Sequence, residues 1–80
     1  MSIKLLFFAQ CAEWMQKKEM NLNLAAPQTL LDVMKCVSAL TPLIARKTYL
    51  KVAVNQVFAD YETEVHDGDE VAFFPPFSGG

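Results

Sequence analysis

The chain has 80 residues, which is the length of one small domain and is enough to bury a modest hydrophobic core. Hydrophobic residues make up 52% of it and charged residues 20%, a globular composition that excludes intrinsic disorder. The formal net charge is −2 and the seven basic residues are scattered, so we expect no nucleic-acid partner.

Three elements are predicted in the N-terminal half. Ile3–Ala9 is an apolar run of strand length, and Met20–Leu24 alternates apolar residues with asparagine, as half-buried strands do. Between them, Cys11–Lys18 has apolar residues at helical spacing and predicts a short amphipathic helix. Because no apolar run reaches the length of a membrane span or a signal-peptide core, we expect a cytoplasmic protein without membrane contact.

A second helix is predicted after Thr29. This residue is a suitable N-cap, and Asp32 stands where a capping box has its carboxylate partner. The apolar residues that follow share one helical face: Leu30, Val33, Met34, Val37 and Leu40. We therefore expect this helix to pack one side against the core.

Three strands are predicted after the second helix: Tyr49–Val54, Val57–Ala59 and Asp69–Phe74. Turns are predicted at Asn55–Gln56 and Asp67–Gly68. The order of elements indicates an α+β fold, in which helices pack on one face of a sheet. The sequence alone does not determine the order of the strands in that sheet.

Alternation along the first and last strands predicts a second apolar surface. Because successive side chains point to opposite faces of a sheet, only every second residue can face the helices. The remaining face then carries four apolar residues: Leu6, Phe8, Ala72 and Phe74. A contiguous exposed apolar patch usually marks a protein interface, so we predict a docking surface there. The alternative is that residues 41–48 fold over this face and bury it.

The C-terminal residues form the most distinctive motif. The last strand runs into Pro75 and Pro76, which hold the chain extended, and then into Phe77–Gly80, whose sequence is FSGG. From Pro75 to the terminus, the extended chain reaches at most roughly 20 Å. Such a slim tail can enter a narrow channel and place its terminal carboxylate in another protein's active site. The alternative is a frayed terminus without a function.

No metal or catalytic role is predicted for the other reactive side chains. His66, the one histidine, has no nucleophile that the sequence places beside it. The acidic residues within 67–70 do not continue into the pattern of a calcium loop. Cys11 and Cys36 lack CxxC spacing and histidine partners, so we expect free thiols.

The sequence resembles the family of molybdopterin synthase small subunits, MoaD, within the ubiquitin-like β-grasp superfamily. The resemblance covers the whole chain and is carried by Leu6–Gln10 (LFFAQ), Val52–Gln56 (VAVNQ) and the terminal block DGDEVAFFPPFSGG. It implies a ubiquitin-like β-grasp domain over residues 1–76 with a single mixed sheet, followed by a flexible Gly-Gly carrier tail over residues 77–80.

A sulfur-carrier mechanism is what the resemblance implies. A MoeB-type activating enzyme uses ATP to adenylate the Gly80 carboxylate, and a persulfide sulfur donor converts the acyl-adenylate into a thiocarboxylate. The tail then enters a MoaE-type large subunit, which transfers its sulfur to cyclic pyranopterin monophosphate to build the molybdopterin dithiolene. The family's assembly is a heterotetramer, and the small subunit binds no cofactor and is not an enzyme on its own.

Particular residues take roles from the same resemblance. Gly80 is the acyl and sulfur carrier, and Gly79 is the slim residue before it. Phe8, Phe58 and Phe74 match a hydrophobic docking surface. The remaining partner-binding positions follow the last strand: Pro75, Pro76, Phe77 and Ser78.

Two departures and two alternatives stay open. The family often has arginine before glutamate where this chain has Ala12–Glu13, and a smaller valine where it has Phe77. A sulfur carrier of the thiamine or ubiquitin-related-modifier type also ends in Gly-Gly, although the PPFSGG tail favours molybdopterin. A non-covalent β-grasp interaction module is the other alternative, and it would function without Gly79–Gly80.

Overall fold

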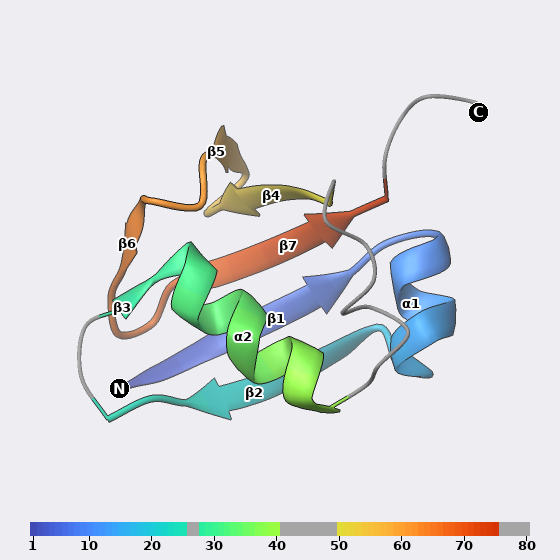
Figure 1. Ribbon diagram of the computed structural model, residues 1–80, viewed down its shortest axis with the longest axis horizontal. Helices are drawn as coiled ribbons and strands as arrows, with labels where there is room; N and C mark the ends of the chain where they lie inside the picture. Colours follow the sequence, from blue (N-terminus) through green and yellow to red (C-terminus); the bar gives the residue numbers. More distant parts are fainter. Residues whose placement is uncertain (26–27, 41–49, 76–80) are drawn as a thin grey trace.

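The computed structural model describes residues 1–25, 28–40 and 50–75. Within these ranges the chain forms a five-stranded mixed sheet with strand order β2-β1-β7-β4-β5, together with two helices (Figure 1). The strands of this sheet are β1 (Ser2–Phe7), β2 (Glu19–Asn23), β4 (Lys51–Val54), β5 (Val57–Ala59) and β7 (Glu70–Phe74). The predicted α+β class, with a mixed sheet and packed helices, is confirmed.

The strands nearest the two ends of the chain pair at the centre of the sheet. β1 and β7 are parallel, with Leu5 opposite Val71 and Phe7 opposite Phe73. The other pairs in this sheet are antiparallel, with β2 beside β1 and with β4 between β7 and β5. Because β1 and β7 run in the same direction, β7 stops at the end of the sheet where β1 also stops (Figure 1).

α2 (Leu30–Leu40) crosses one face of the sheet and begins at the predicted capping box (Figure 1). The Thr29 backbone N–H donates to Asp32 Oδ2 at 3.0 Å, and the Asp32 N–H donates to Thr29 Oγ1 at 3.4 Å. The backbone hydrogen bond from Thr29, and after it the bond from the Thr29 hydroxyl, lowers the pKa of the Asp32 carboxyl. These reciprocal bonds satisfy amide groups that a helix N-terminus otherwise leaves unpaired.

The core lies between α2 and the sheet. Alternate residues of β1 and β7 enter it, and the rings of Phe7 and Phe73 stack there with centroids 5.6 Å apart. The buried residues of this cluster are Ile3, Leu5, Phe7, Cys11, Met15, Leu24, Leu30, Val33, Val37, Leu50, Val52, Val65, Val71 and Phe73. Since burial of apolar area is the main favourable contribution to folding, this face of the sheet supplies most of the stability.

α1 (Gln10–Met15) lies at the end of the sheet where β1 stops, and it is shorter than the predicted Cys11–Lys18 (Figure 1). Gln16 adopts a left-handed conformation with φ of 59°, and its N–H donates to the carbonyl of Glu13 at 3.2 Å. This residue ends the helix without the glycine that usually marks such a C-cap in sequence. Trp14 of this helix is half-buried and packs against the core.

The first predicted strand is also shorter than expected. Ala9 has a φ of 50°, so the chain leaves the strand geometry after Phe7 and turns into α1. Phe8 nevertheless stays beside β7, because its N–H donates to the Phe73 carbonyl at 3.1 Å. The strand predicted from Tyr49 is observed over Lys51–Val54, and Tyr49 itself lies outside the described residues.

A second, two-stranded sheet was not predicted. It consists of β3 (Gln28–Thr29) paired antiparallel with β6 (Glu64–Val65). It holds the start of α2, where the N–H groups of Leu30 and Leu31 donate to the carbonyls of Thr63 and Tyr61 at 2.9 and 3.0 Å. Two-residue strands are too short to show a period-two pattern in the sequence.

Both predicted turns are confirmed, and one of them fixes the β4–β5 hairpin to β7. Asn55 and Gln56 have φ of 50° and 73°, as in the tight turns that suit twisted hairpins. The Asn55 amide donates to Asp69 Oδ1 at 3.0 Å and its oxygen accepts the Glu70 N–H at 3.0 Å. The hairpin is therefore held in register with the strand that leads to the tail.

Candidate functional site

The face of the sheet opposite α2, here called the open face, carries the predicted apolar residues. Leu6, Phe8, Ala72 and Phe74 line one groove together, as alternation along β1 and β7 predicts. Phe8 is 43% exposed, whereas its neighbour Phe7 is 3% exposed. The alternative covering by residues 41–48 lies outside the described residues.

Three phenylalanines from different parts of the chain form an aromatic cluster on this face. The rings of Phe8 and Phe74 are stacked, with centroids 4.8 Å apart and an interplanar angle of 3°. Phe58 of β5, which is 61% exposed, contacts Phe74 from its other side with centroids 5.5 Å apart. Offset and tilted ring pairs are favourable arrangements, so the cluster is a defined surface and not three independent side chains.

The groove beside the cluster has a volume of about 350 Å³. Ala53 of β4 and Ala72 of β7 are paired in register at its floor, and the large rings stand around them. Its lining residues are Leu6, Phe8, Ala53, Gln56, Phe58, Glu70, Ala72 and Phe74. Small residues beneath large ones leave room for a side chain from another molecule.

Sequence reasoning missed three of these lining residues: Ala53, Gln56 and Glu70. Alternation along β4 could have found Ala53, because its neighbour Val52 belongs to the buried core on the other face. The sequence places Glu70 in the last strand and in an acidic run without the pattern of a calcium loop, and neither feature indicates a binding role. Phe58 was assigned by resemblance, since a three-residue strand gives too short a pattern to place its face.

A second hollow, of about 610 Å³, lies on the other side of Phe8. It is lined by Leu6, Phe7, Phe8, Ala9, Ala12, Lys18 and Glu19. The departure from the family at Ala12 therefore falls in this hollow, next to the aromatic cluster. Beside it, Lys4 Nζ forms an ion pair with Glu19 Oε2 at 3.0 Å, and Glu19 raises the pKa of Lys4.

The tail begins directly at the aromatic cluster. β7 ends at Phe74, and Pro75 follows it, half-buried. Pro76, Phe77, Ser78, Gly79 and Gly80 lie outside the described residues, as does the predicted boundary between residues 1–76 and 77–80. Their roles stay predictions, but the structure shows which surface the last described residue adjoins.

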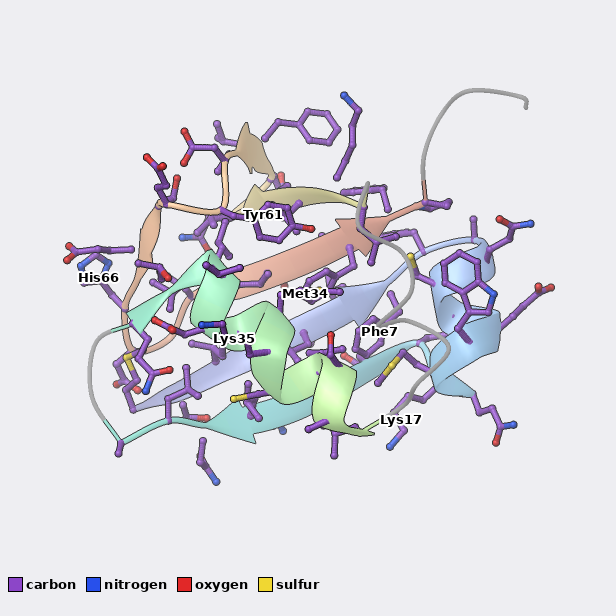
Figure 2. The ribbon with its side chains drawn as sticks, viewed as in Figure 1. Phe7, Lys17, Met34, Lys35, Tyr61 and His66 are labelled. Carbon is purple, nitrogen blue, oxygen red and sulfur yellow. The ribbon has the colours of Figure 1, made fainter. Side chains whose placement is uncertain are left out.

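The other reactive groups are not assembled into a catalytic site in the described ranges. His66 lies at the outer edge of the molecule with a side chain that is 66% exposed, and its Nδ1 is 3.8 Å from Asp69 Oδ2 (Figure 2). Cys11 and Cys36 are free thiols, and burial raises the pKa of Cys11 to about 11. Within these ranges no three potential metal ligands lie together, and no helix is long and apolar enough to cross a membrane.

A mixed sheet with parallel terminal strands, crossed on one face by a helix, defines a ubiquitin-like β-grasp domain. Solved structures agree: SAMP1 from Haloferax volcanii has a TM-score of 0.86 and 25% identity, covering 100% of both chains. A chain in the complex of subunits 1 and 2 of the molybdopterin-converting factor from Helicobacter pylori has a TM-score of 0.72 and 20% identity, again covering 100% of both chains. At 20% identity, the match to the Helicobacter pylori chain shows a shared fold alone.

The chain belongs to the ThiS family, which matches it over residues 5–80. It is 38% identical over 80 residues to the molybdopterin synthase sulfur carrier subunit of Escherichia coli strain K12, covering 98% of this chain and 99% of that protein. The same subunit of Haemophilus influenzae is 34% identical over 80 residues, with the same coverage. The matched residues of the family include the whole Gly-Gly tail.

Proposed function

We propose that this chain is the sulfur-carrier subunit of a molybdopterin synthase and that the Gly80 carboxylate is its reactive group. The near-full-length similarity to two molybdopterin synthase sulfur carrier subunits carries the proposal. The open face supports it, because an exposed aromatic cluster at the base of the tail suits a protein that works inside a complex. The described side chains form no convergent catalytic set, so the chain contributes a substrate-like tail and its partner contributes the catalytic groups.

Charging of the tail requires activation of a poor acyl donor. A MoeB-type enzyme would use ATP to adenylate the Gly80 carboxylate. The resulting acyl-adenylate carries AMP as a good leaving group, which the free carboxylate lacks. The terminal sulfur of a persulfide donor would then attack the acyl carbon and displace AMP, which gives an acyl disulfide. A second thiol would attack the donor's sulfur in that acyl disulfide, form a disulfide with the donor and release the thiocarboxylate. The absence of Cβ atoms at Gly79 and Gly80 leaves the acyl carbon open to attack. ATP is thus consumed by the activating enzyme and is not a cofactor of this chain.

Sulfur transfer requires the tail to be placed in the partner's active site. Docking of a MoaE-type large subunit on Phe8, Phe58 and Phe74 would fix the point from which the tail extends. From Pro75 the tail reaches at most roughly 20 Å, so the acceptor, cyclic pyranopterin monophosphate, must bind within that distance of the docked cluster. We further propose a cytoplasmic heterotetramer in which two such chains serve a dimer of large subunits.

Intact mass spectrometry tests the carrier role. After incubation with ATP, the activating enzyme and a sulfur donor, the chain should gain the mass difference of one oxygen exchanged for sulfur, localised to its C-terminal peptide. A variant extended by one residue beyond Gly80 is the matched control and should gain nothing. An unchanged mass with a demonstrably active enzyme, or normal sulfur transfer by the extended variant, would contradict the proposal.

A protein-modifier role is the second candidate. The similarity to SAMP1, the small archaeal modifier protein 1, favours it. Such a role would join the Gly80 carboxylate to lysines of other proteins through an isopeptide bond. Mass spectrometry of chymotryptic digests of cell extracts would detect Ser-Gly-Gly remnants on those lysines, because cleavage after Phe77 leaves these three residues attached. A thiamine-type carrier would instead copurify with the enzymes of that pathway and not with a MoaE-type subunit.

A further inference from the structure

Glu70 places a carboxylate at the edge of the groove. It is half-buried and lines the groove with Gln56 and the apolar residues named above. Its backbone N–H donates to Asn55 Oδ1 at 3.0 Å, but in the described ranges its carboxylate accepts no hydrogen bond and has no cation within ion-pair distance. The side chain therefore depends on water at the place where another molecule would dock.

Charges on the open face are unbalanced around this residue. Lys4 of β1 stands opposite Glu70 of β7 in the parallel register. On the other side of β1, Glu19 of β2 is paired with Leu6, two residues along the strand from Lys4. Lys4 forms its 3.0 Å ion pair with Glu19 and interacts with Glu70 only at longer range. One ammonium thus faces two carboxylates, and the carboxylate that has no ion pair among the described residues is the one that borders the groove.

A partner that covers the groove removes the water around Glu70. An ionised carboxylate that loses its water is strongly unfavourable unless a cation or hydrogen-bond donors replace that water. An apolar partner surface alone would match the alanines and phenylalanines but would leave this charge buried and unpaired. Productive docking therefore requires a cation or hydrogen-bond donors opposite Glu70, and a cation would also balance the excess of negative charge around this residue.

We propose that the groove receives a segment of the large subunit that places an apolar side chain over Ala53 and Ala72 and a lysine or arginine against Glu70. This rests on the proposed function and identifies the chemistry of the docking partner. Arginine suits the position best, because its planar guanidinium can bond to both carboxylate oxygens, and Gln56 offers an amide beside them. Glu70 then determines which apolar surfaces are accepted and how they are oriented.

Calorimetric titration of the full chain with the large subunit from the same organism, at several salt concentrations, tests this inference. We expect Glu70→Gln to weaken binding about tenfold or more and Glu70→Lys about a hundredfold or more. Affinity should fall with salt for the unsubstituted chain and less steeply for Glu70→Gln. Glu62→Gln, which removes an exposed carboxylate in the turn after β5, is the matched control and should leave binding unchanged.

Each other outcome has a distinct meaning. Equal or tighter binding by Glu70→Gln, or the same salt dependence, would overturn the assigned charge pair while leaving the carrier function intact. Self-association of the chain alone, if Glu70→Gln abolishes it in sedimentation, would assign the groove to a second copy and overturn the partner assignment. If the unsubstituted chain does not bind the large subunit, the proposed function fails and this inference fails with it. Circular dichroism would verify that the variants fold.

Discussion

The two faces of the sheet are built from the same strands and differ in what covers them. Phe73 and Phe74 are consecutive residues of β7 with the same side chain. Phe73 is 0% exposed in the core on the face that α2 crosses, whereas Phe74 is half-buried on the open face between two other rings. The position of a residue in the two-residue period of the strand, and not its chemical type, determines whether it stabilises the fold or remains available to a partner.

Apolar area has a different energetic consequence on each face. On the face beneath α2, it is removed from water when the chain folds, so it contributes to the free energy of folding. On the open face, much of the area of Phe8 and Phe58 stays in water until another molecule covers it. We therefore expect truncation of a ring on the buried face to lower the free energy of unfolding, and truncation of a ring on the open face to lower the affinity for the partner.

Phe73→Ala should have the largest effect. Removal of a fully buried ring leaves a cavity that the surrounding core cannot refill, and such substitutions reduce the free energy of unfolding by about 3–5 kcal/mol. In a domain of this size, that is most of the available stability. Urea unfolding followed by circular dichroism provides the measurement. A loss below about 1 kcal/mol would mean that the two faces do not differ as proposed.

Phe74→Ala should weaken partner binding much more than it lowers the free energy of unfolding. We expect affinity for the large subunit to fall by on the order of 2 kcal/mol or more, because the ring lies at the centre of the aromatic cluster. The free energy of unfolding should change by only about 1 kcal/mol, since the stacking with Phe8 and Phe58 is partly exposed. Val57→Ala, an exposed apolar residue of β5 outside the groove, is the control for calorimetry. Unchanged affinity of Phe74→Ala would count against the docking surface.

Cys11 reports whether solvent can reach the core on the face that α2 crosses. Burial raises its pKa to about 11, whereas a thiol in the unfolded chain ionises near 8.5. The folded state therefore retains this proton over a range where the unfolded state has lost it. Stability from this group is complete below about pH 8.5 and declines as the pH rises toward 11.

Urea unfolding between pH 7 and 11 would measure that decline. The decline should be smaller in Cys11→Ala than in the unsubstituted chain. As a companion measurement, iodoacetamide should label the half-buried Cys36 before Cys11 in the native protein. Equal labelling rates would indicate that the face beneath α2 opens readily.

Asp32→Asn should have the smallest effect, because it alters only the cap of the helix that covers the buried face. The pKa of Asp32 is lowered, so its contribution is present above the unfolded pKa near pH 4 and is lost as the pH falls through the lower folded value. Thermal unfolding should show a lower Tm for the variant at pH 7 and converging values near pH 2. Glu64→Gln, which alters an exposed carboxylate, serves as the control. A constant Tm difference at all pH values would contradict this role.

Local patterns in the sequence predicted which side chains lie on each of the two faces of the sheet. The placement of Phe8 and Phe74 followed from alternation, and the Thr29–Asp32 cap and both turns followed from residue chemistry within a few positions. Where a local signal was missing, prediction failed. Gln16 ends α1 in a left-handed conformation without a glycine, and β3 and β6 are too short for any period.

Non-local features could not be predicted from composition or spacing. The strand order depends on pairing between β1 and β7, which are separated by most of the chain. The significance of Glu70 depends on that pairing, which places it opposite Lys4. Lys4 forms its ion pair with Glu19, so Glu70 has no ion-pair partner in the described ranges. The roles of Phe58 and the tail came from family resemblance, because neither a three-residue strand nor a terminal Gly-Gly identifies a partner.

The parallel pairing of β1 with β7 also has a practical consequence for handling the protein. Met1 lies at the opposite end of the sheet from Phe74, and six-residue β1 spans about 20 Å between them (Figure 1). The Met1 ammonium donates to the Leu24 carbonyl at 2.7 Å, and an amide at the same position would still have one N–H for that bond. An affinity tag or surface attachment placed before Met1 therefore leaves the docking surface and the terminal carboxylate accessible. The same tag fused after Gly80 would turn that carboxylate into an amide.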